Sequence, residues 1–147
     1  MEYLYVPGSN FFMGEAEKMA KNYSTDHNWP TGSVVVKDGK IIGRGANQAA
    51  LKNKWLMNFH RQYFCIRKFL KIKSGQKYWL CPGCSPASLH SEPRAIADAK
   101  KYGVTEGADL YLWGHYWCCE PCQKAIIKAG LVNVYLLEGS DKLFNKS

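Results

Sequence analysis

The chain has 147 residues, of which 46% are hydrophobic and 22% charged, a composition that suits one packed domain and excludes a disordered chain. No stretch has the roughly 18 consecutive apolar residues that a membrane-spanning helix needs. The N-terminus also lacks the basic and apolar regions of a secretory signal. We therefore expect a single domain over residues 1–147 that works in the cytoplasm, away from membranes.

The formal net charge of +8 is concentrated in one part of the sequence. Outside residues 51–89 the basic and acidic residues balance, and inside that segment there is no acidic residue. Its basic residues are Lys52, Lys54, Arg61, Arg67, Lys68, Lys71, Lys73 and Lys77. A local positive field of this kind attracts the phosphate of a nucleotide or of a nucleic acid. The alternative is the solvated face of a helix, and the sequence leaves both open.

The first half of the chain predicts a helix, a hairpin and a second helix, in that order. Apolar residues at helical spacing predict a helix over residues 14–24. Two β-branched runs at 34–36 and 40–42 flank an Asp-Gly pair at 38–39, which is a strong signal for a hairpin turn. Residues 55–72 combine an apolar stripe with basic residues, which is typical of an amphipathic helix.

Helices and strands alternate in the second half. A helix is expected over about 91–103, where a proline in the first turn and a glycine at the end fit its two ends. A strand follows at 110–113, then a helix over about 119–130 and a strand at 132–137. This alternation favours an α/β fold with a layered sheet and parallel strand pairing in this half.

Two short motifs contain the residue types that bind zinc. They are His90-Ser91-Glu92 and the CxxC pair Cys119 and Cys122. A catalytic zinc takes three protein ligands and leaves its fourth position open, so one imidazole and two thiolates suffice. Each motif falls at a predicted helix N-terminus, whose positive end lowers thiol pKa values. We expect His90, Cys119 and Cys122 to bind Zn²⁺ and Glu92 to move protons. A closed structural zinc site is the alternative, but such a site has no use for Glu92.

The sequence resembles the zinc-dependent cytidine and deoxycytidylate deaminase superfamily. The signature of zinc deaminases is H-x-E followed by P-C-x-x-C, with the glutamate as acid–base group. The similar segments here are VVVKDGKIIGRGAN, HSEPRAI and CEPCQKAIIKAGLVNVYLL, and their order looks most like the deoxycytidylate deaminase branch. The resemblance implies a three-layer α/β/α fold with a mixed, roughly five-stranded sheet. It also implies a catalytic zinc ion and a homo-oligomer.

The resemblance further implies a reaction, the hydrolysis of the exocyclic amine of a nucleobase. Its simplest form is conversion of a free nucleotide, dCMP, to dUMP with release of ammonia, with Glu92 moving the protons. A second interpretation is a deaminase of tRNA or another polynucleotide, because five tryptophans and a positive charge suit single strands. A third is a zinc-stabilised nucleic-acid-binding module without catalysis, against which Glu92 argues.

Four residues are candidates for contact with the substrate. By resemblance, Asn47 would hydrogen-bond to the sugar, although a turn asparagine is the simpler alternative. His115 and Trp117 lie just before the metal cysteines and would border the base, with core packing as the alternative. Ser91 is the fourth candidate, and the superfamily usually has alanine there. The superfamily also usually has proline at position 118, where this chain has Cys118, which we expect to be a packed thiol.

Residues 48–89 resemble an insertion that nucleotide deaminases of this branch often carry between the asparagine and the H-x-E motif. The insertion contains Cys65 and the CxxC pair Cys81 and Cys84. In one interpretation these three cysteines bind a second, structural zinc ion, with His60 as an alternative ligand to Cys65. In the other they are reduced loop thiols.

Overall fold

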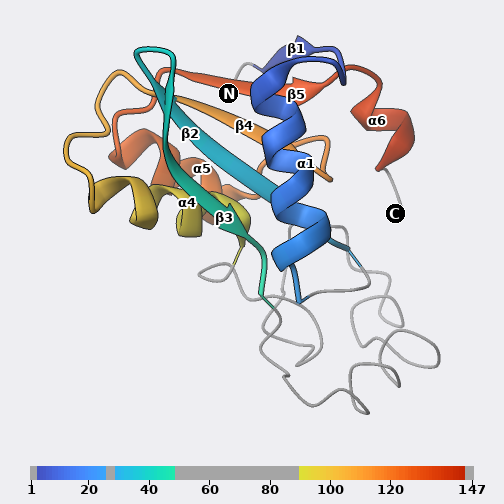
Figure 1. Cartoon of the computed structure of the whole chain (residues 1–147), viewed down its shortest axis with the longest axis horizontal. Coiled ribbons are helices and arrows are strands. Elements are labelled where there is room, and N and C mark those ends of the chain that lie inside the picture. The colour runs from blue at the N-terminus through green and yellow to red at the C-terminus, as the bar shows by residue number, and fades with distance from the viewer. Residues whose placement is uncertain (1–2, 26–28, 49–89, 145–147) are drawn as a thin grey trace.

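The computed structural model describes residues 3–25, 29–48 and 90–144, which form a five-stranded sheet with helices packed on it (Figure 1). The elements in chain order are β1 (Leu4–Val6), α1 (Phe11–Tyr23), β2 (Gly32–Lys37), β3 (Lys40–Ala46), α4 (Ser91–Lys100), β4 (Asp109–Trp113), α5 (Glu120–Lys128), β5 (Asn133–Leu137) and α6 (Ser140–Leu143). Within these ranges no helix combines the length and the apolar character that crossing a bilayer requires.

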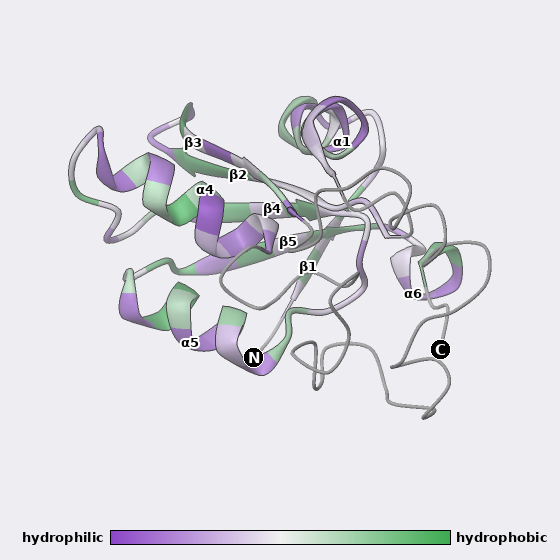
Figure 2. Cartoon of the chain, turned by 90° about the horizontal axis from the view of Figure 1, so that it is seen from below, coloured by the Kyte–Doolittle hydropathy of each residue, from purple (hydrophilic) through white to green (hydrophobic). Residues whose placement is uncertain are grey.

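The sheet is mixed, with the strand order β1-β5-β4-β2-β3. The pairs β1–β5 and β5–β4 are parallel, whereas β4–β2 and β2–β3 are antiparallel. Helix α1 lies on one face of the sheet, and α4 and α5 lie on the other (Figure 2). The expected three-layer α/β/α fold with a mixed, five-stranded sheet is therefore confirmed, including the parallel pairing in the second half.

The local signals in the sequence placed the hairpin and two helix starts correctly. Asp38 and Gly39 have φ angles of 52° and 75°, and a two-residue type I′ turn requires positive φ at both positions. Helix α4 begins at Ser91, and α5 begins at Glu120 with Pro121 in its first turn. Proline fits there because the first N–H groups of a helix have no partner within it.

Other predictions differ from the structure. Helix α1 begins three residues before the predicted start, because the Asn10 side chain accepts a hydrogen bond of 3.0 Å from the Met13 N–H and caps the helix. Strand β1 and helix α6 were not predicted, since three or four residues are too few to show a period. The predicted helix over 55–72 lies outside the described residues.

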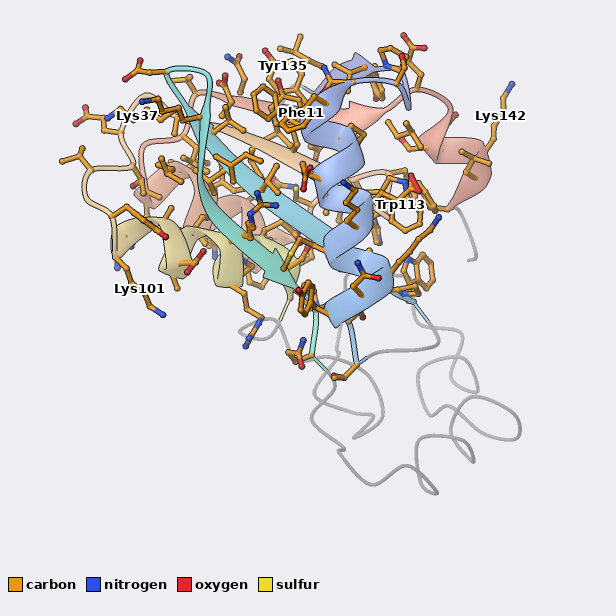
Figure 3. The ribbon with its side chains drawn as sticks, viewed as in Figure 1. Phe11, Lys37, Lys101, Trp113, Tyr135 and Lys142 are labelled. Carbon is orange, nitrogen blue, oxygen red and sulfur yellow. The ribbon has the colours of Figure 1, made fainter. Side chains whose placement is uncertain are left out.

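Each face of the sheet has its own apolar cluster. The cluster between the sheet and α4 and α5 includes Val35, Leu110, Leu112, Ile126 and Leu136. The cluster under α1 includes Met13, Ala16, Val34, Val36 and Tyr111. Trp113 ends β4 on the α1 side, with its ring centroid 5.6 Å from the Lys21 Nζ and 5.1 Å from the Phe144 ring (Figure 3). Alternate residues of each strand thus serve opposite layers.

Glycines in β3 let the backbone of α4 lie directly against the sheet. A Cβ atom built on Gly45 would lie 2.5 Å from both the Ala95 nitrogen and the Ser91 carbonyl oxygen. One built on Gly43 would lie 2.3 Å from the Ala95 carbonyl oxygen. Since these neighbours are backbone atoms, a side chain at either position would push the helix away. The first turn of α4, which contains Ser91 and Glu92, is therefore fixed relative to β2 and β3.

We predict that Gly45→Ala lowers the free energy of unfolding by about 1–3 kcal/mol, because the added methyl group overpacks the contact between helix and strand. Urea denaturation measures this change. Gly14→Ala is the matched control, because a Cβ there has no neighbour within 4 Å and alanine favours a helix. We expect the control to be as stable as the parent or about 0.5–1 kcal/mol more stable. Equal stability of the two variants would contradict the close backbone contact.

Candidate metal centre

Two helix N-termini supply the predicted metal ligands. His90 is the N-cap residue of α4 and Cys119 the N-cap residue of α5, and their backbones have nearly the same conformation, with φ/ψ of −67/159° and −64/159°. Neither side chain caps its own helix. Cys122 lies in the first turn of α5, three residues after Cys119, so both thiols lie on the same side of that turn.

The structure brings the three predicted ligands together. The His90 Nδ1 lies 3.3 Å from the sulfur of Cys119 and 3.3 Å from that of Cys122, and the two sulfurs are 2.9 Å apart. Among the described residues, this is the one group of three or more His, Cys, Asp or Glu whose ligand atoms all lie within 4.8 Å of one another. One imidazole nitrogen and two thiolates are a ligand set that suits Zn²⁺. His90, Cys119 and Cys122 therefore form a possible zinc site with three protein ligands.

The two thiols titrate differently because they share a hydrogen bond. The pKa of Cys119 is lowered to about 6, mainly by its hydrogen bond with Cys122 and further by His90. The pKa of Cys122 is raised, mainly by the same hydrogen bond and further by burial. The hydrogen bond between the two thiols therefore favours the thiolate form of Cys119. Thiolates, and not thiols, are the metal-binding form of cysteine.

Glu92 lies beside the metal ligands and is not part of the group of three. Its carboxylate is in the first turn of α4 and is buried, with 5% of its surface exposed. Its Oε1 accepts a hydrogen bond of 2.7 Å from the Ser91 hydroxyl. Burial, and then the negative charge of Glu92, raise the pKa of the Cys118 thiol. A buried carboxylate thus stands next to the metal ligands without occupying a ligand position.

Cys118 is a fully buried thiol, as expected, and it lies outside the group of metal ligands. Its backbone N–H donates a hydrogen bond of 2.9 Å to the Tyr3 hydroxyl oxygen. Burial raises the pKa of Tyr3 to about 12, so the phenol stays neutral at physiological pH. Proline, the residue that the deaminase signature has at this position, has no N–H. This chain therefore needs an acceptor that the signature does not, and Tyr3 supplies it.

An aromatic stack occupies the loop between β4 and α5. The His115 ring stacks on Trp29 at 5.3 Å and on Tyr116 at 5.1 Å, and it meets Trp117 edge-on at 5.7 Å. Backbone N–H groups of Tyr116 and Trp117 donate to the His115 Nδ1 at 3.0 and 3.2 Å. In the neutral ring the proton therefore sits on Nε2. The structure places His115 and Trp117 together in a half-buried aromatic group.

Asn47 holds the segment that carries Trp29. Its Oδ1 accepts a hydrogen bond of 2.9 Å from the Thr31 N–H, and its Nδ2 donates one of 2.8 Å to the Trp29 carbonyl oxygen. The Trp29 indole N–H in turn donates to the Gly114 carbonyl oxygen at 2.9 Å. Asn47 is buried, with 4% of its surface exposed. The two hydrogen bonds use both the oxygen and the nitrogen of its side-chain amide. A contact between Asn47 and a sugar stays a prediction.

Of the remaining predicted site residues, Ser91 is described by the structure and three cysteines are not. Ser91 is fully buried, with its hydroxyl 2.8 Å from that of Ser33 and bonded to Glu92, and its contact with a substrate stays a prediction. The predicted second zinc site of Cys65, Cys81 and Cys84 lies outside the described residues, as does nearly all of the basic insertion. Tyr3 and Ser33 were missed, because they contact the site across 115 and 58 positions of sequence.

We predict that Cys122→Ala removes one zinc ion per chain relative to the parent, because two ligands do not hold the metal tightly. Metal analysis of the purified protein by inductively coupled plasma mass spectrometry measures the ratio. Cys118→Ala is the matched control, since it deletes a buried thiol next to the site that is not a ligand. If the control loses the same ion, Cys118 belongs to the ligand set and the assignment is wrong.

We also predict that Tyr3→Phe destabilises the zinc-loaded protein by about 1–3 kcal/mol, because the Cys118 N–H is left without an acceptor. The change is measured by urea denaturation. Tyr5→Phe removes a hydroxyl from a side chain that is 56% exposed, and this control should match the parent. A Tyr3→Phe variant as stable as the control would show that water replaces the lost acceptor.

Comparisons with known proteins agree with this site. The cytidine and deoxycytidylate deaminase zinc-binding region matches residues 8–138. ComE operon protein 2 of Bacillus subtilis (strain 168) is 27% identical, and the match covers 90% of this chain and 60% of that protein. The chain thus spans less than two thirds of this curated relative.

Two solved structures are similar to this chain, and the first of them, with a TM-score above 0.5, shows the same fold. The dCMP deaminase of the cyanophage S-TIM5, in complex with dCMP and dUMP, is 20% identical with a TM-score of 0.53, over 90% of this chain and 84% of that one. A diaminohydroxyphosphoribosylaminopyrimidine deaminase/5-amino-6-(5-phosphoribosylamino)uracil reductase from Thermotoga maritima is 28% identical with a TM-score of 0.49, over 85% of this chain and 28% of that one. Since the family match extends over most of its length, the chain belongs to the family of the cytidine and deoxycytidylate deaminase zinc-binding region.

Proposed function

We propose that this protein is a zinc-dependent hydrolytic deaminase that acts on the base of a free nucleotide, converting dCMP to dUMP and ammonia. The observation that carries the proposal is the buried Glu92 carboxylate, which lies beside the three ligand residues and outside their group. A closed structural zinc site has four protein ligands, whereas the described residues supply three and add an acid–base group. Family membership supports the same chemistry.

Each residue of the site has a distinct task in this reaction. His90, Cys119 and Cys122 hold the metal, which when bound supplies a Lewis acid that makes water a nucleophile near neutral pH. Glu92 transfers the two protons of the attacking water in turn, the first to the ring nitrogen and the second to the leaving amine. The oxygen of water thus replaces the amine, which leaves as ammonia, and the carboxylate is regenerated. Proton transfer by a positioned side chain contributes about 10²–10⁴-fold to such rates.

Two features support a nucleotide as the substrate. The half-buried stack of Trp29, His115, Tyr116 and Trp117 offers aromatic faces to a base. The excess of positive charge between residues 51 and 89 suits a phosphate. The cyanophage enzyme of the same fold was solved with dCMP and dUMP, which makes dCMP the first compound to test.

We further propose that the protein is a cytoplasmic homo-oligomer.

A polynucleotide is the second candidate substrate, because stacked aromatic side chains and positive charge also suit single strands. Incubating the zinc-loaded protein with dCMP, dCTP, cytidine and tRNA, and measuring released ammonia, separates the candidates. The proposal expects dCMP to be converted fastest. Conversion of tRNA without conversion of any free nucleotide would move the assignment to the second candidate, and tight binding of RNA without ammonia would indicate a binding module.

We predict that Glu92→Gln keeps its zinc and lowers kcat for dCMP by at least about 10²-fold, because the amide cannot accept the proton from water. The measurements are steady-state kinetics and metal analysis on the same preparation. Glu120→Gln is the matched control, because Glu120 occupies the first turn of α5 but its side chain is 80% exposed. The control should turn over at the parent rate, and a Glu92→Gln variant that did so too would remove Glu92 from the mechanism.

A further inference from the structure

We propose that the hydroxyl groups of Ser33 and Ser91 form a chain that positions the Glu92 carboxylate for proton transfer. Both serines are positioning residues in this proposal, and Glu92 is the group that acts on the substrate. The proposal rests on the function proposed above for Glu92. It assigns Ser91 a task different from the direct substrate contact expected from the sequence.

The chain consists of two short hydrogen bonds in the interior of the protein. The Ser33 and Ser91 hydroxyl oxygens are 2.8 Å apart, and the Ser91 hydroxyl lies 2.7 Å from the Glu92 Oε1. Both serines are completely buried, and Glu92 is 5% exposed. A buried hydroxyl without a partner is costly, so each of these groups depends on the next one in the chain. The carboxylate is thereby tied to β2, the strand between β4 and β3 in the sheet.

The direction of the two hydrogen bonds follows from the number of protons available. An ionised carboxylate only accepts hydrogen bonds, and a serine hydroxyl has a single proton to donate. Since Ser91 donates its proton to Glu92, it has none left for Ser33. Ser33 must therefore donate to Ser91, and both bonds point towards the carboxylate. Hydrogen bonds aligned in one chain polarise and strengthen one another.

The fold explains why these three residues meet. Ser33 lies in β2 and pairs with Gly45 of β3 on one side and with Leu112 of β4 on the other. Because Gly45 has no side chain, the first turn of α4 approaches the sheet at this point, and the Ser91 carbonyl oxygen would contact a Cβ there. Ser33 lies on the same face of β2 as Val35, which packs in the cluster under α4 and α5. Its hydroxyl therefore faces the first turn of the helix that bears Glu92.

The consequence for the reaction is a carboxylate with a fixed orientation. The bond from Ser91 holds Oε1 and restricts rotation of the carboxylate, which orients Glu92 for proton exchange with water and substrate. A displacement of about 1 Å in a catalytic group lowers rates by up to about 10²-fold.

Steady-state kinetics of the zinc-loaded full chain with dCMP test the proposal. We expect Ser91→Ala to lower kcat about tenfold or more, since hydrogen bonds to charged groups are strong, and to leave KM and zinc content unchanged. Ser33→Ala should lower kcat less, because Ser91 still bonds to Glu92. The double variant should be no slower than Ser91→Ala, because Ser33 acts through Ser91. If the decreases in kcat caused by Ser33→Ala and by Ser91→Ala multiply in the double variant, the proposal is wrong.

Thr105→Val is the control for the loss of a buried hydroxyl in general. The Thr105 hydroxyl donates at 2.7 Å to the Ala129 carbonyl oxygen and belongs to no part of the site. This variant should be less stable than the parent and retain its kcat. The proposal is wrong if Ser91→Ala retains the parent kcat, or if Thr105→Val loses kcat to the same extent.

A second measurement separates this proposal from the assignment of the substrate. If the parent does not deaminate dCMP, the substrate assignment fails. The hydrogen-bond chain of Ser33, Ser91 and Glu92 is then tested by its effect on stability. Urea midpoints of Ser91→Ala, Glu92→Gln and their double variant form a cycle on the zinc-loaded protein. We expect the shift of the double variant to differ from the sum of the single shifts, because the two side chains share one hydrogen bond. Additive shifts would show that Ser91 does not hold Glu92.

Discussion

The backbone of α4 lies directly against β3, because Gly43 and Gly45 leave no side chain between the helix and the strand. This contact fixes the height and rotation of the first turn of α4 over the sheet. It sets His90 at the helix N-terminus beside Cys119 and Cys122 and sets Glu92 in the buried first turn of α4. A bulkier β3 would separate the two helix starts, and the three ligand atoms would no longer converge.

Burial of charged and ionisable groups at this site is costly, and the fold compensates for it locally. Glu92 is almost completely buried, but it lies at the positive end of a helix and accepts a hydrogen bond from Ser91. Cys119 and Cys122 likewise lie at the start of a helix, and their thiols are within hydrogen-bonding distance of each other and of His90. The same arrangement that stabilises a thiolate near neutral pH prepares a site for a divalent cation.

The departures of this sequence from the deaminase signature have partners elsewhere in the chain. Where the signature has proline, Cys118 has a backbone N–H, which donates a hydrogen bond to the hydroxyl oxygen of Tyr3 near the N-terminus. The serine at position 91 forms a hydrogen bond with Ser33 on β2. In both cases a polar group in the interior is matched by a second polar group, because an unmatched one would cost about 1–3 kcal/mol. Each pair couples the site to the sheet beneath it.

The sequence by itself determined the features that depend on near neighbours. The Asp38-Gly39 turn, the helix starts at 91 and 120, and the spacing of Cys119 and Cys122 are local patterns, and each was predicted because turn and cap geometry depends on a few consecutive residues. Tertiary structure alone decided which distant residues meet. The hydroxyl of Ser33 and the pairing of β1 with β5 have no local pattern, because each partner lies far along the chain and the contact exists only once the layers have packed.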